Sequence, residues 1–567
     1  MSLMFQYGRW AALILAVAAL GCWSNKSDPV GPEADGGPEW FEDVTDAVGL
    51  DFVHDPGPTD TYFMPQIMGS GAAFIHDGDG TLYVYLLQNA GPKSGSVNRL
   101  YRREADGKFR DVTAGSGLDV PGFNMGAAVA DINNDGLPDV LVTQFCGARL
   151  FLNLGAGRFE DVTTAAGLNN PVWGTSAAFF DYDRDGWLDL VITNYVEYNP
   201  KSECQSARGT RDFCGPMGLP PVCSRLFHNL GPNTGSRVKF EDVSFDSGLG
   251  RVPGPGLGVV CADFDGDGWP DVFVANDAQP NRLWINRRNG TFVDEAMSRG
   301  VAYTTTGKAF ANMGIALGDV ANTGMLDIYV THLMRETNTL WRQGPRGQFR
   351  DRSVEAGLTT TRWQGTGFGT LMADFDLDGA VDIAVANGRI NRDGPANAPG
   401  LGFWESYAER NQIFANSGTG TFRDLSPGNK AFCGPWNVAR GLACADVDGD
   451  GAPDLLITTI GNRARLYRNV APGRGHWLTV RAIDPRWKRD AYGAEVRVKS
   501  GGVERLRLIN PAQSYLSSGT PLALFGLGQA TLIDSIRVVW PDGTKEAFPG
   551  GAVDRSIVLR RGEGKPE

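Results

Sequence analysis

Five short segments carry the spacing Asp-x-Asp/Asn-x-Asp-Gly-x-x-Asp, in which oxygen ligands alternate before a glycine. Such a segment can wrap one hard cation of the size of Ca²⁺, because the glycine permits a sharp turn and the backbone carbonyl of the seventh residue completes the shell. The spacing predicts one calcium ion per segment, about five in all. The predicted ligands are Asp131, Asn133, Asp135, Leu137, Asp139; Asp181, Asp183, Asp185, Trp187, Asp189; Asp263, Asp265, Asp267, Trp269, Asp271; Asp374, Asp376, Asp378, Ala380, Asp382; Asp446, Asp448, Asp450, Ala452 and Asp454.

Two other interpretations of these segments are weaker. An EF-hand needs a glutamate at its twelfth position and helices on both sides. A solvated acidic turn without metal would crowd three or four carboxylates together, and their repulsion is what a divalent cation removes. The twelfth residues are β-branched, so each segment leads into a strand: Val142, Ile192, Val274, Val385 and Ile457.

Two related segments have an incomplete ligand set. The one near residue 77 has Ile75 and Tyr83 where the outer aspartates would lie. The one near residue 319 has Ala321 and Thr323 in place of the middle ligands. Neither is expected to hold calcium well.

The elements around these segments belong to a repeat. Phrases of the type FEDVTxAxGL begin at residues 41, 109, 159, 240, 292 and 349, and a seventh, FRDLS, begins at 422. Each unit also has an acidic segment and apolar runs rich in Val, Ile, Leu and Phe, which are bounded by turn residues and so predict four short strands. Seven such units predict a closed β-propeller, with residues 41–45 completing the seventh blade.

The chain divides into five predicted parts. Residues 1–21 are an export signal, because Arg9 precedes the apolar run 11–20, which is too short to span a membrane. The segment 19–22 resembles a bacterial lipobox, which implies lipidation of Cys22, with plain secretion as the alternative. Residues 22–38 form a flexible tether, 39–470 the propeller, 475–560 a small all-β domain and 561–567 a tail.

The cysteines fit an exported protein. None of the remaining seven lies in a CxxC pair, so a zinc site is not indicated, and export favours a disulfide within the cluster 204–223. Cys261 and Cys444 precede acidic segments in apolar strand sequence, which indicates buried, inert thiols.

The repeat resembles the FG-GAP or VCBS repeats of the integrin α-subunit propeller, whose acidic loops join the first and second strands of a blade. Beyond it, HWLTVRAID (476–484), SYLSS (514–518), FGLG (525–528) and IRVVWPDG (536–543) resemble the ASPIC/UnbV domain. Together the two regions are similar to bacterial relatives of the cartilage acidic protein family. The EGF-like module of the vertebrate members has no counterpart here, so matrix roles are not transferred.

A partner is expected on the face opposite the acidic loops. The insertions 195–224 and 388–410 both follow second strands, and long loops on a rigid ring often carry function. The candidate contacts are Tyr195, Tyr198, Trp404, Tyr407 and Arg410, with simple packing of the insertions as the alternative.

Charge and motifs limit the function. The net charge of −12 argues against nucleic acid and anionic membranes, so a membrane is expected only through an N-terminal lipid. HExxH, GxSxG and P-loop motifs are absent from the sequence. We therefore expect a non-enzymatic recognition or adhesion scaffold at the cell envelope that binds an unknown protein or glycan; a carbohydrate-binding or carbohydrate-active propeller is the alternative.

Overall fold

The computed structural model describes residues 36–567 except 79, 233–235 and 393–397. The predicted signal, Cys22 and the tether up to residue 35 lie outside the described residues. Nearly all regular structure in the described part of the chain is β-strand, so the predicted all-β class is confirmed.

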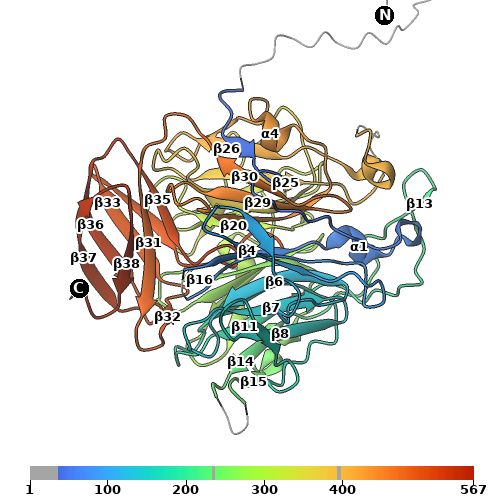
Figure 1. Cartoon of the computed structure of the whole chain (residues 1–567), viewed down its shortest axis with the longest axis horizontal. Helices are drawn as coiled ribbons and strands as arrows, with labels where there is room; N and C mark the ends of the chain where they lie inside the picture. The colour runs from blue at the N-terminus through green and yellow to red at the C-terminus, as the bar shows by residue number, and fades with distance from the viewer. Residues whose placement is uncertain (1–35, 79, 233–235, 393–397) are drawn as a thin grey trace, which may run out of the picture. The chain divides into compact units, whose positions relative to one another are not determined.

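Seven sheets of four antiparallel strands form the repeat region (Figure 1). Blades one to three comprise β2 (Ala72–His76), β3 (Leu82–Leu86), β4 (Arg99–Arg103), β5 (Phe109–Asp111); β6 (Asn124–Ala130), β7 (Asp139–Gln144), β8 (Gly147–Asn153), β9 (Phe159–Asp161); and β10 (Gly174–Phe180), β11 (Asp189–Asn194), β14 (Arg225–Asn229), β15 (Phe240–Asp242). Blades four to seven comprise β16 (Gly256–Ala262), β17 (Asp271–Asn276), β18 (Arg282–Asn286), β19 (Phe292–Asp294); β20 (Ile315–Gly318), β21 (Asp327–Val330), β22 (Thr339–Gln343), β23 (Phe349–Asp351); β24 (Gly367–Ala373), β25 (Asp382–Asn387), β26 (Gln412–Asn416), β27 (Phe422–Asp424); and β28 (Ala439–Ala445), β29 (Asp454–Thr459), β30 (Arg465–Asn469) with β1 (Phe41–Asp43).

The seventh blade closes the ring as predicted. Its outer strand is β1, from the N-terminal end of the propeller, and β1 pairs with β30 in the register Phe41↔Asn469. The first and last parts of the propeller therefore share one sheet, which leaves no open end in the ring of blades.

Close packing of the blades explains the apolar strand sequences. In β7, Val140 and Val142 face a cluster shared with the first blade, whereas Leu141 between them faces a cluster shared with the third blade. Both faces of an inner strand are buried, so its sequence is a continuous apolar run rather than an alternation.

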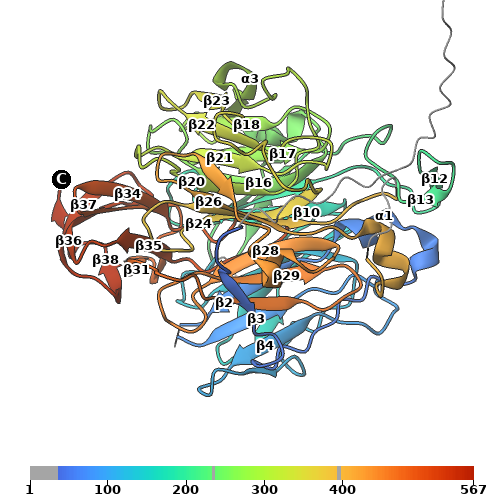
Figure 2. The ribbon, with the colours of Figure 1, turned by 90° about the horizontal axis from the view of Figure 1, so that it is seen from above.

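The C-terminal domain consists of two further sheets around a core of its own (Figure 2). One sheet contains β31 (His476–Asp484), β32 (Arg489–Asp490), β35 (Ala523–Gly528) and β38 (Arg555–Arg560); the other contains β33 (Glu495–Ser500), β34 (Val503–Leu508), β36 (Leu532–Val539), β37 (Lys545–Ala552) and β39 (Lys565–Pro566). Because β39 pairs with β37, residues 561–567 are not a loose tail, which corrects the predicted boundary at 560.

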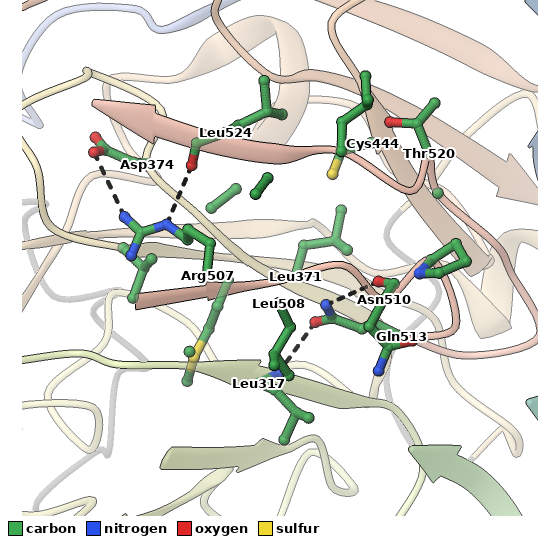
Figure 3. A pocket seen from close by; sticks show the side chains of 18 of the residues that line it. Leu317, Leu371, Asp374, Cys444, Arg507, Leu508, Asn510, Gln513, Thr520 and Leu524 are labelled. Carbon is green, nitrogen blue, oxygen red and sulfur yellow. Dashed lines mark hydrogen bonds and ion pairs between the residues drawn. The ribbon is translucent and has the colours of Figure 1, made fainter. Parts of the chain in front are cut away.

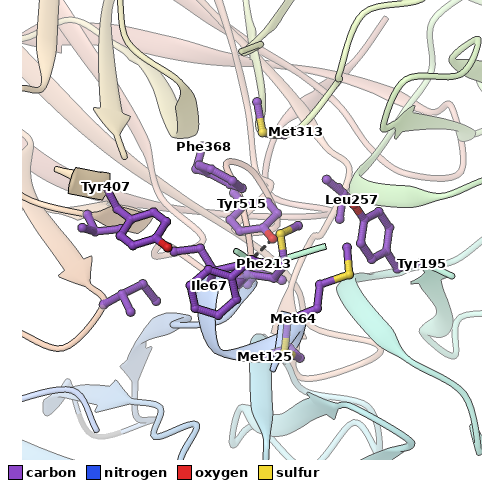
Figure 4. Close-up of a cluster of buried hydrophobic side chains, with 14 of the residues drawn as sticks. Met64, Ile67, Met125, Tyr195, Phe213, Leu257, Met313, Phe368, Tyr407 and Tyr515 are labelled. Atoms are coloured by element: carbon purple, nitrogen blue, oxygen red, sulfur yellow. Dashed lines mark hydrogen bonds between the residues drawn. The ribbon is translucent and has the colours of Figure 1, made fainter. Parts of the chain in front are cut away.

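The segment 510–519 of this domain inserts among the innermost strands of the propeller. Ser514 exchanges two backbone hydrogen bonds with Ile315, and the carbonyl of Leu516 accepts one from Ala127. The Tyr515 hydroxyl donates to the Met68 carbonyl at 2.9 Å, within a buried cluster drawn from several blades (Figure 4). We call this segment the plug, because it satisfies backbone groups of several inner strands at once.

The two insertions pack with α1 and η3 in one buried cluster, on the side of the propeller away from the C-terminal domain (Figure 1). The helices are η1 (Thr59–Thr61), α1 (Met64–Met68), α2 (Ser244–Ser247), η2 (Leu249–Arg251), α3 (Ala296–Arg299), η3 (Gly402–Tyr407) and α4 (Lys430–Cys433). The first insertion contains the hairpin of β12 (Cys204–Gln205) and β13 (Arg211–Asp212), and a disulfide joins Cys204 to Cys214, as expected for the cluster. The second insertion packs on it, since the Tyr407 hydroxyl donates to Asp212 at 2.6 Å.

Candidate metal centres

Each acidic segment is the loop between the first and second strands of a blade, as the repeat predicts. The sixth residue is glycine with φ between 87° and 103° in the five complete loops, a conformation that favours glycine over residues with a side chain. The first aspartate holds this turn in each loop; in the third blade, for example, Asp181 Oδ2 accepts from the Gly186 amide at 3.1 Å. The ligand side chains are thus fixed by hydrogen bonds of the loop itself.

Four loops bring three carboxylates together. The acids at positions one, three and nine offer oxygens within 4.8 Å of one another in the third, fourth, sixth and seventh blades. The groups are Asp181, Asp183, Asp189; Asp263, Asp265, Asp271; Asp374, Asp376, Asp382; and Asp446, Asp448, Asp454. The second blade forms no such group among the described residues and has Asn133 at position three.

Two first-position aspartates have a buried oxygen without a hydrogen-bond partner. Oδ1 of Asp181 and Oδ1 of Asp374 are both in this state, and the Asp374 side chain is almost completely buried. Burial, together with the neighbouring carboxylates, raises the pKa of each to about 7, while Arg489 acts against this shift at Asp181 and Arg507 at Asp374. A desolvated oxygen surrounded by like charges is what a hard cation would satisfy, so these residues fit Ca²⁺.

The ninth aspartate has a second, purely structural role. In the fourth blade, Asp271 accepts the Asn286 amide at 2.9 Å and the Phe264 amide at 3.1 Å. Asp327 makes the same pair of bonds in the fifth blade, although that loop lacks the middle ligands. The presence of this aspartate in a loop is therefore weak evidence for a metal site, because it fastens the loop to the third strand in complete and incomplete loops alike.

Arginines partner several other loop carboxylates. Arg288 contacts Asp267 at 2.7 Å and Arg474 contacts Asp450 at 2.7 Å, both at position five. In these loops the fifth-position side chain is therefore paired outside the group of positions one, three and nine.

Sequence reasoning missed the asparagine that ends the third strand. The Asn286 side-chain amide donates to the Tyr182 carbonyl of the preceding blade's loop at 2.8 Å and to Pro270 of its own loop at 3.2 Å. Asn229, Asn416 and Asn469 bridge neighbouring loops in the same way. The final asparagine of the phrases RLFHN, RLWIN and RLYRN was the available signal.

The C-terminal domain lies against the loops, which the sequence did not predict. Asp374 Oδ2 accepts the Gly526 amide at 3.1 Å and lies 3.8 Å from the Arg507 guanidinium (Figure 3). Arg489 donates to Asn134 in the second blade's loop at 2.7 Å and to the Gly186 carbonyl in the third blade's loop at 3.2 Å. A cavity of about 90 Å³ lies between the C-terminal domain, at Arg507, and the fifth to seventh blades, with Cys444 of the seventh blade in its lining.

On the opposite face, four of the five candidate ligand contacts are interior residues. Tyr195, Tyr198, Trp404 and Tyr407 are at most 8% exposed and belong to one buried cluster with helix α1. Packing of the insertions, the alternative raised above, describes these four, which corrects their assignment as ligand contacts. Arg410 remains partly exposed, with its guanidinium 5.6 Å from the ring of Trp363 and 5.0 Å from that of Trp436.

Cys261 and Cys444 fit the prediction of inert thiols. Cys261 is buried and Cys444 is partly buried. Burial raises the pKa of Cys444 to about 12 and that of Cys261 well above its ordinary value. A thiol with such a pKa is protonated at neutral pH and therefore a poor nucleophile.

Comparison with protein-family models agrees with this arrangement. A model described as an FG-GAP-like repeat matches residues 76–142, 131–192, 263–330 and 401–457. A model described as ASPIC and UnbV matches residues 485–566. The chain belongs to the FG-GAP repeat proteins with a C-terminal ASPIC/UnbV domain. The descriptions of the two family models that match this FG-GAP repeat protein name no catalytic activity.

Curated relatives of the FG-GAP repeat protein include Cartilage acidic protein 1 of Homo sapiens, 27% identical over 316 residues, a match that covers 54% of this chain and 44% of the human protein. The Xenopus tropicalis protein of the same name is 28% identical with the same coverage. The chain thus matches less than half the length of these relatives. Among solved structures, one describing recognition of non-reducing terminal N-acetylglucosamine by an Agrocybe aegerita lectin covers 70% of this chain and 86% of its own, with 13% identity and a TM-score of 0.37.

No helix in residues 36–567, gaps excepted, has both the length and the apolar character needed to cross a bilayer.

Proposed function

We propose that this FG-GAP repeat protein is an exported recognition or adhesion scaffold of the cell envelope. In this proposal about five calcium ions, one in each complete loop, stabilise its propeller. One observation carries the calcium part: Asp374 Oδ1 is buried, lacks a hydrogen-bond partner and belongs to a group of three converging carboxylates. In this proposal the loop side chains bind the cation, and the cation removes their mutual repulsion.

Metal counting with matched variants tests the calcium part. Residues 39–567 are freed of metal, returned to calcium, and analysed for bound calcium and melting temperature in calcium, magnesium and chelator. Asp374→Asn should lose one calcium ion per chain, because this loop has all its ligands. The control Asp319→Asn alters the same position of the incomplete fifth loop and should lose none. An absence of bound calcium, with identical melts in calcium and chelator, would refute the proposal.

The recognition part rests on the face opposite the loops, because the C-terminal domain lies against the loop face. There Arg410 lies beside Trp363 and Trp436, all partly exposed. Trp and Arg are the residues that most often dominate binding energy at protein interfaces. A binding partner found by surface-protein screening should lose affinity with Arg410→Ala and Trp436→Ala but not with the exposed control Arg110→Ala. Equal binding by all three variants would refute this location.

A glycan ligand is the second candidate. The same two indole rings offer apolar faces next to a cationic donor, an arrangement suited to a sugar ring with its hydroxyl groups. A glycan array separates the two candidates: a hit that Trp436→Ala abolishes favours the glycan, and a blank array with a retained protein partner rules it out.

A further inference from the structure

Among the five complete loops of the described residues, that of the third blade has an imidazole beside its carboxylates. His228 Nε2, from strand β14, lies 3.1 Å from Asp183 Oδ2 and 3.6 Å from Asp185 Oδ2. These three ligand atoms form one of the clusters within 4.8 Å, and Asp183 also belongs to the group of the loop itself. We propose that His228 is a metal ligand here and that the third blade prefers a divalent transition ion, such as Mn²⁺ or Zn²⁺, taking Ca²⁺ only where such an ion is lacking.

The residue types at the matching position support this assignment. The residue before the strand-ending Asn or Gln is Leu152, Ile285, Arg342, Ala415 and Arg468 in the other blades from the second to the seventh. None of these side chains can donate an electron pair to a metal at neutral pH. The fifth-position acids of the fourth and seventh blades pair with Arg288 and Arg474, which cannot be deprotonated, whereas Asp185 faces a ring that can.

Two solvent-inaccessible atoms at this site face carboxylates. Asp181 Oδ1 accepts no hydrogen bond, and His228 Nε2 is paired with the carboxylates of Asp183 and Asp185 at 3.1 and 3.6 Å. The Tyr182 ring meets the imidazole edge to face at 5.7 Å between centroids, which restrains the ring orientation. A restrained nitrogen beside carboxylate oxygens is an arrangement that a shared cation would complete.

The donor set decides the class of ion. Ca²⁺ prefers an all-oxygen shell, whereas imidazole suits zinc, copper, iron and nickel, and carboxylates suit manganese. A mixed shell of carboxylates and one imidazole therefore selects borderline transition ions. The alternative is that protonated His228 only forms an ion pair with Asp183 and Asp185, as Arg288 does with Asp267.

This inference rests on the proposed metal-binding role of the loops, and the test separates the two. The chain 39–567 is freed of metal and dialysed against excess calcium with limiting Mn²⁺ or Zn²⁺; bound metals are then counted, and pulsed electron paramagnetic resonance of the Mn²⁺ form looks for a coordinated imidazole nitrogen. The wild type should retain one transition ion per chain with that nitrogen signal. His228→Ala, which reproduces Ala415 of the sixth blade, should bind this ion at least about tenfold more weakly and keep the calcium of the other loops.

The reverse variant protects the test against a folding defect in His228→Ala. Ala415→His places an imidazole beside the complete sixth loop and should add a second transition-ion site. Equal transition-metal binding by the wild type and His228→Ala, or the absence of a nitrogen signal, would overturn the inference even where calcium binds normally. Absence of calcium together with a His228-dependent transition ion would instead refute the calcium proposal and uphold this site.

Discussion

Asp327→Asn isolates the structural role of the ninth loop aspartate from its role toward metal. Asp327 is almost completely buried, and its two oxygens accept the amides of Gln343 at 2.8 Å and Val320 at 3.2 Å. An asparagine keeps one acceptor but turns an NH₂ group toward the other amide. The substitution therefore removes one charge-assisted hydrogen bond and leaves two buried N–H donors, the asparagine NH₂ and a backbone amide, facing each other without an acceptor.

The expected cost follows from those two bonds. Loss of one hydrogen bond to a charged group costs about 1.5 to 3 kcal/mol, and an unsatisfied buried amide adds about 1 to 3 kcal/mol. Burial raises the pKa of Asp327 to about 7, so the wild-type carboxylate carries a desolvation penalty that the neutral asparagine avoids. We expect a net loss of about 3 kcal/mol in the free energy of unfolding.

Measurement in two metal states makes the test specific. The loss for Asp327→Asn should be the same in calcium and in chelator, because Ala321 and Thr323 leave this loop without middle ligands. The matched variant Asp271→Asn breaks the same two bonds in a complete loop and should cost about 2.7 kcal/mol more at calcium a hundredfold above the dissociation constant. Urea denaturation measures both. A neutral Asp327→Asn would refute the clamp, and a loss confined to calcium would mean that the fifth loop binds metal after all.

Three further predictions concern other parts of the fold. Burial lowers the pKa of His332 to about 4 from 6.5, so the stability present above pH 6.5 is lost as the pH falls toward 4. Between pH 7.5 and pH 5 the free energy of unfolding, measured with urea, should therefore fall by about 2 kcal/mol less in His332→Gln than in the wild type. Leu516→Ala in the plug should cost about 2 to 5 kcal/mol, because the side chain is 2% exposed, and thermal melting that matches the wild type would argue against the plug as a stabilising element. Asn286→Ala removes two side-chain hydrogen bonds between neighbouring loops and should lower stability by about 1 to 3 kcal/mol, while retention of the wild-type denaturation midpoint would show that the bridge is dispensable.

The repeat made most of the propeller predictable. The apolar runs and turn residues indicated four strands per unit, and the position of the first FEDVT phrase indicated the strand that closes the ring. These features are local in the sequence and recur in every repeat unit. One correct interpretation of a unit therefore applied to all seven blades. The disulfide within the cluster was predictable in the same way, because its cysteines are ten residues apart.

Exposure of the aromatic residues in the insertions was not predictable. Tyr195 and Tyr407 look like surface contacts in a Gly- and Pro-rich insertion, yet their hydroxyls donate to the buried acids Asp277 and Asp212. Each acid lies far along the chain from its tyrosine, and nothing local to either residue shows that they meet. The plug was hidden for the same reason, since the sequence around Tyr515 has the composition of an ordinary turn-rich loop.

Asp374 shows how metal binding and domain docking can coexist at one carboxylate. Its Oδ2 accepts the Gly379 amide of the loop and the Gly526 amide of the C-terminal domain, and lies 3.8 Å from Arg507. Its Oδ1 has no hydrogen-bond partner. A cation bound at Oδ1, as proposed, would therefore not compete with the C-terminal domain, whose contacts are made at Oδ2. The domain's contacts orient the carboxylate before any ion arrives, whereas the positive charge of Arg507 opposes the ion. Whichever effect is larger, thermodynamic reciprocity requires that docking changes the affinity for the ion by the same factor by which the ion changes docking.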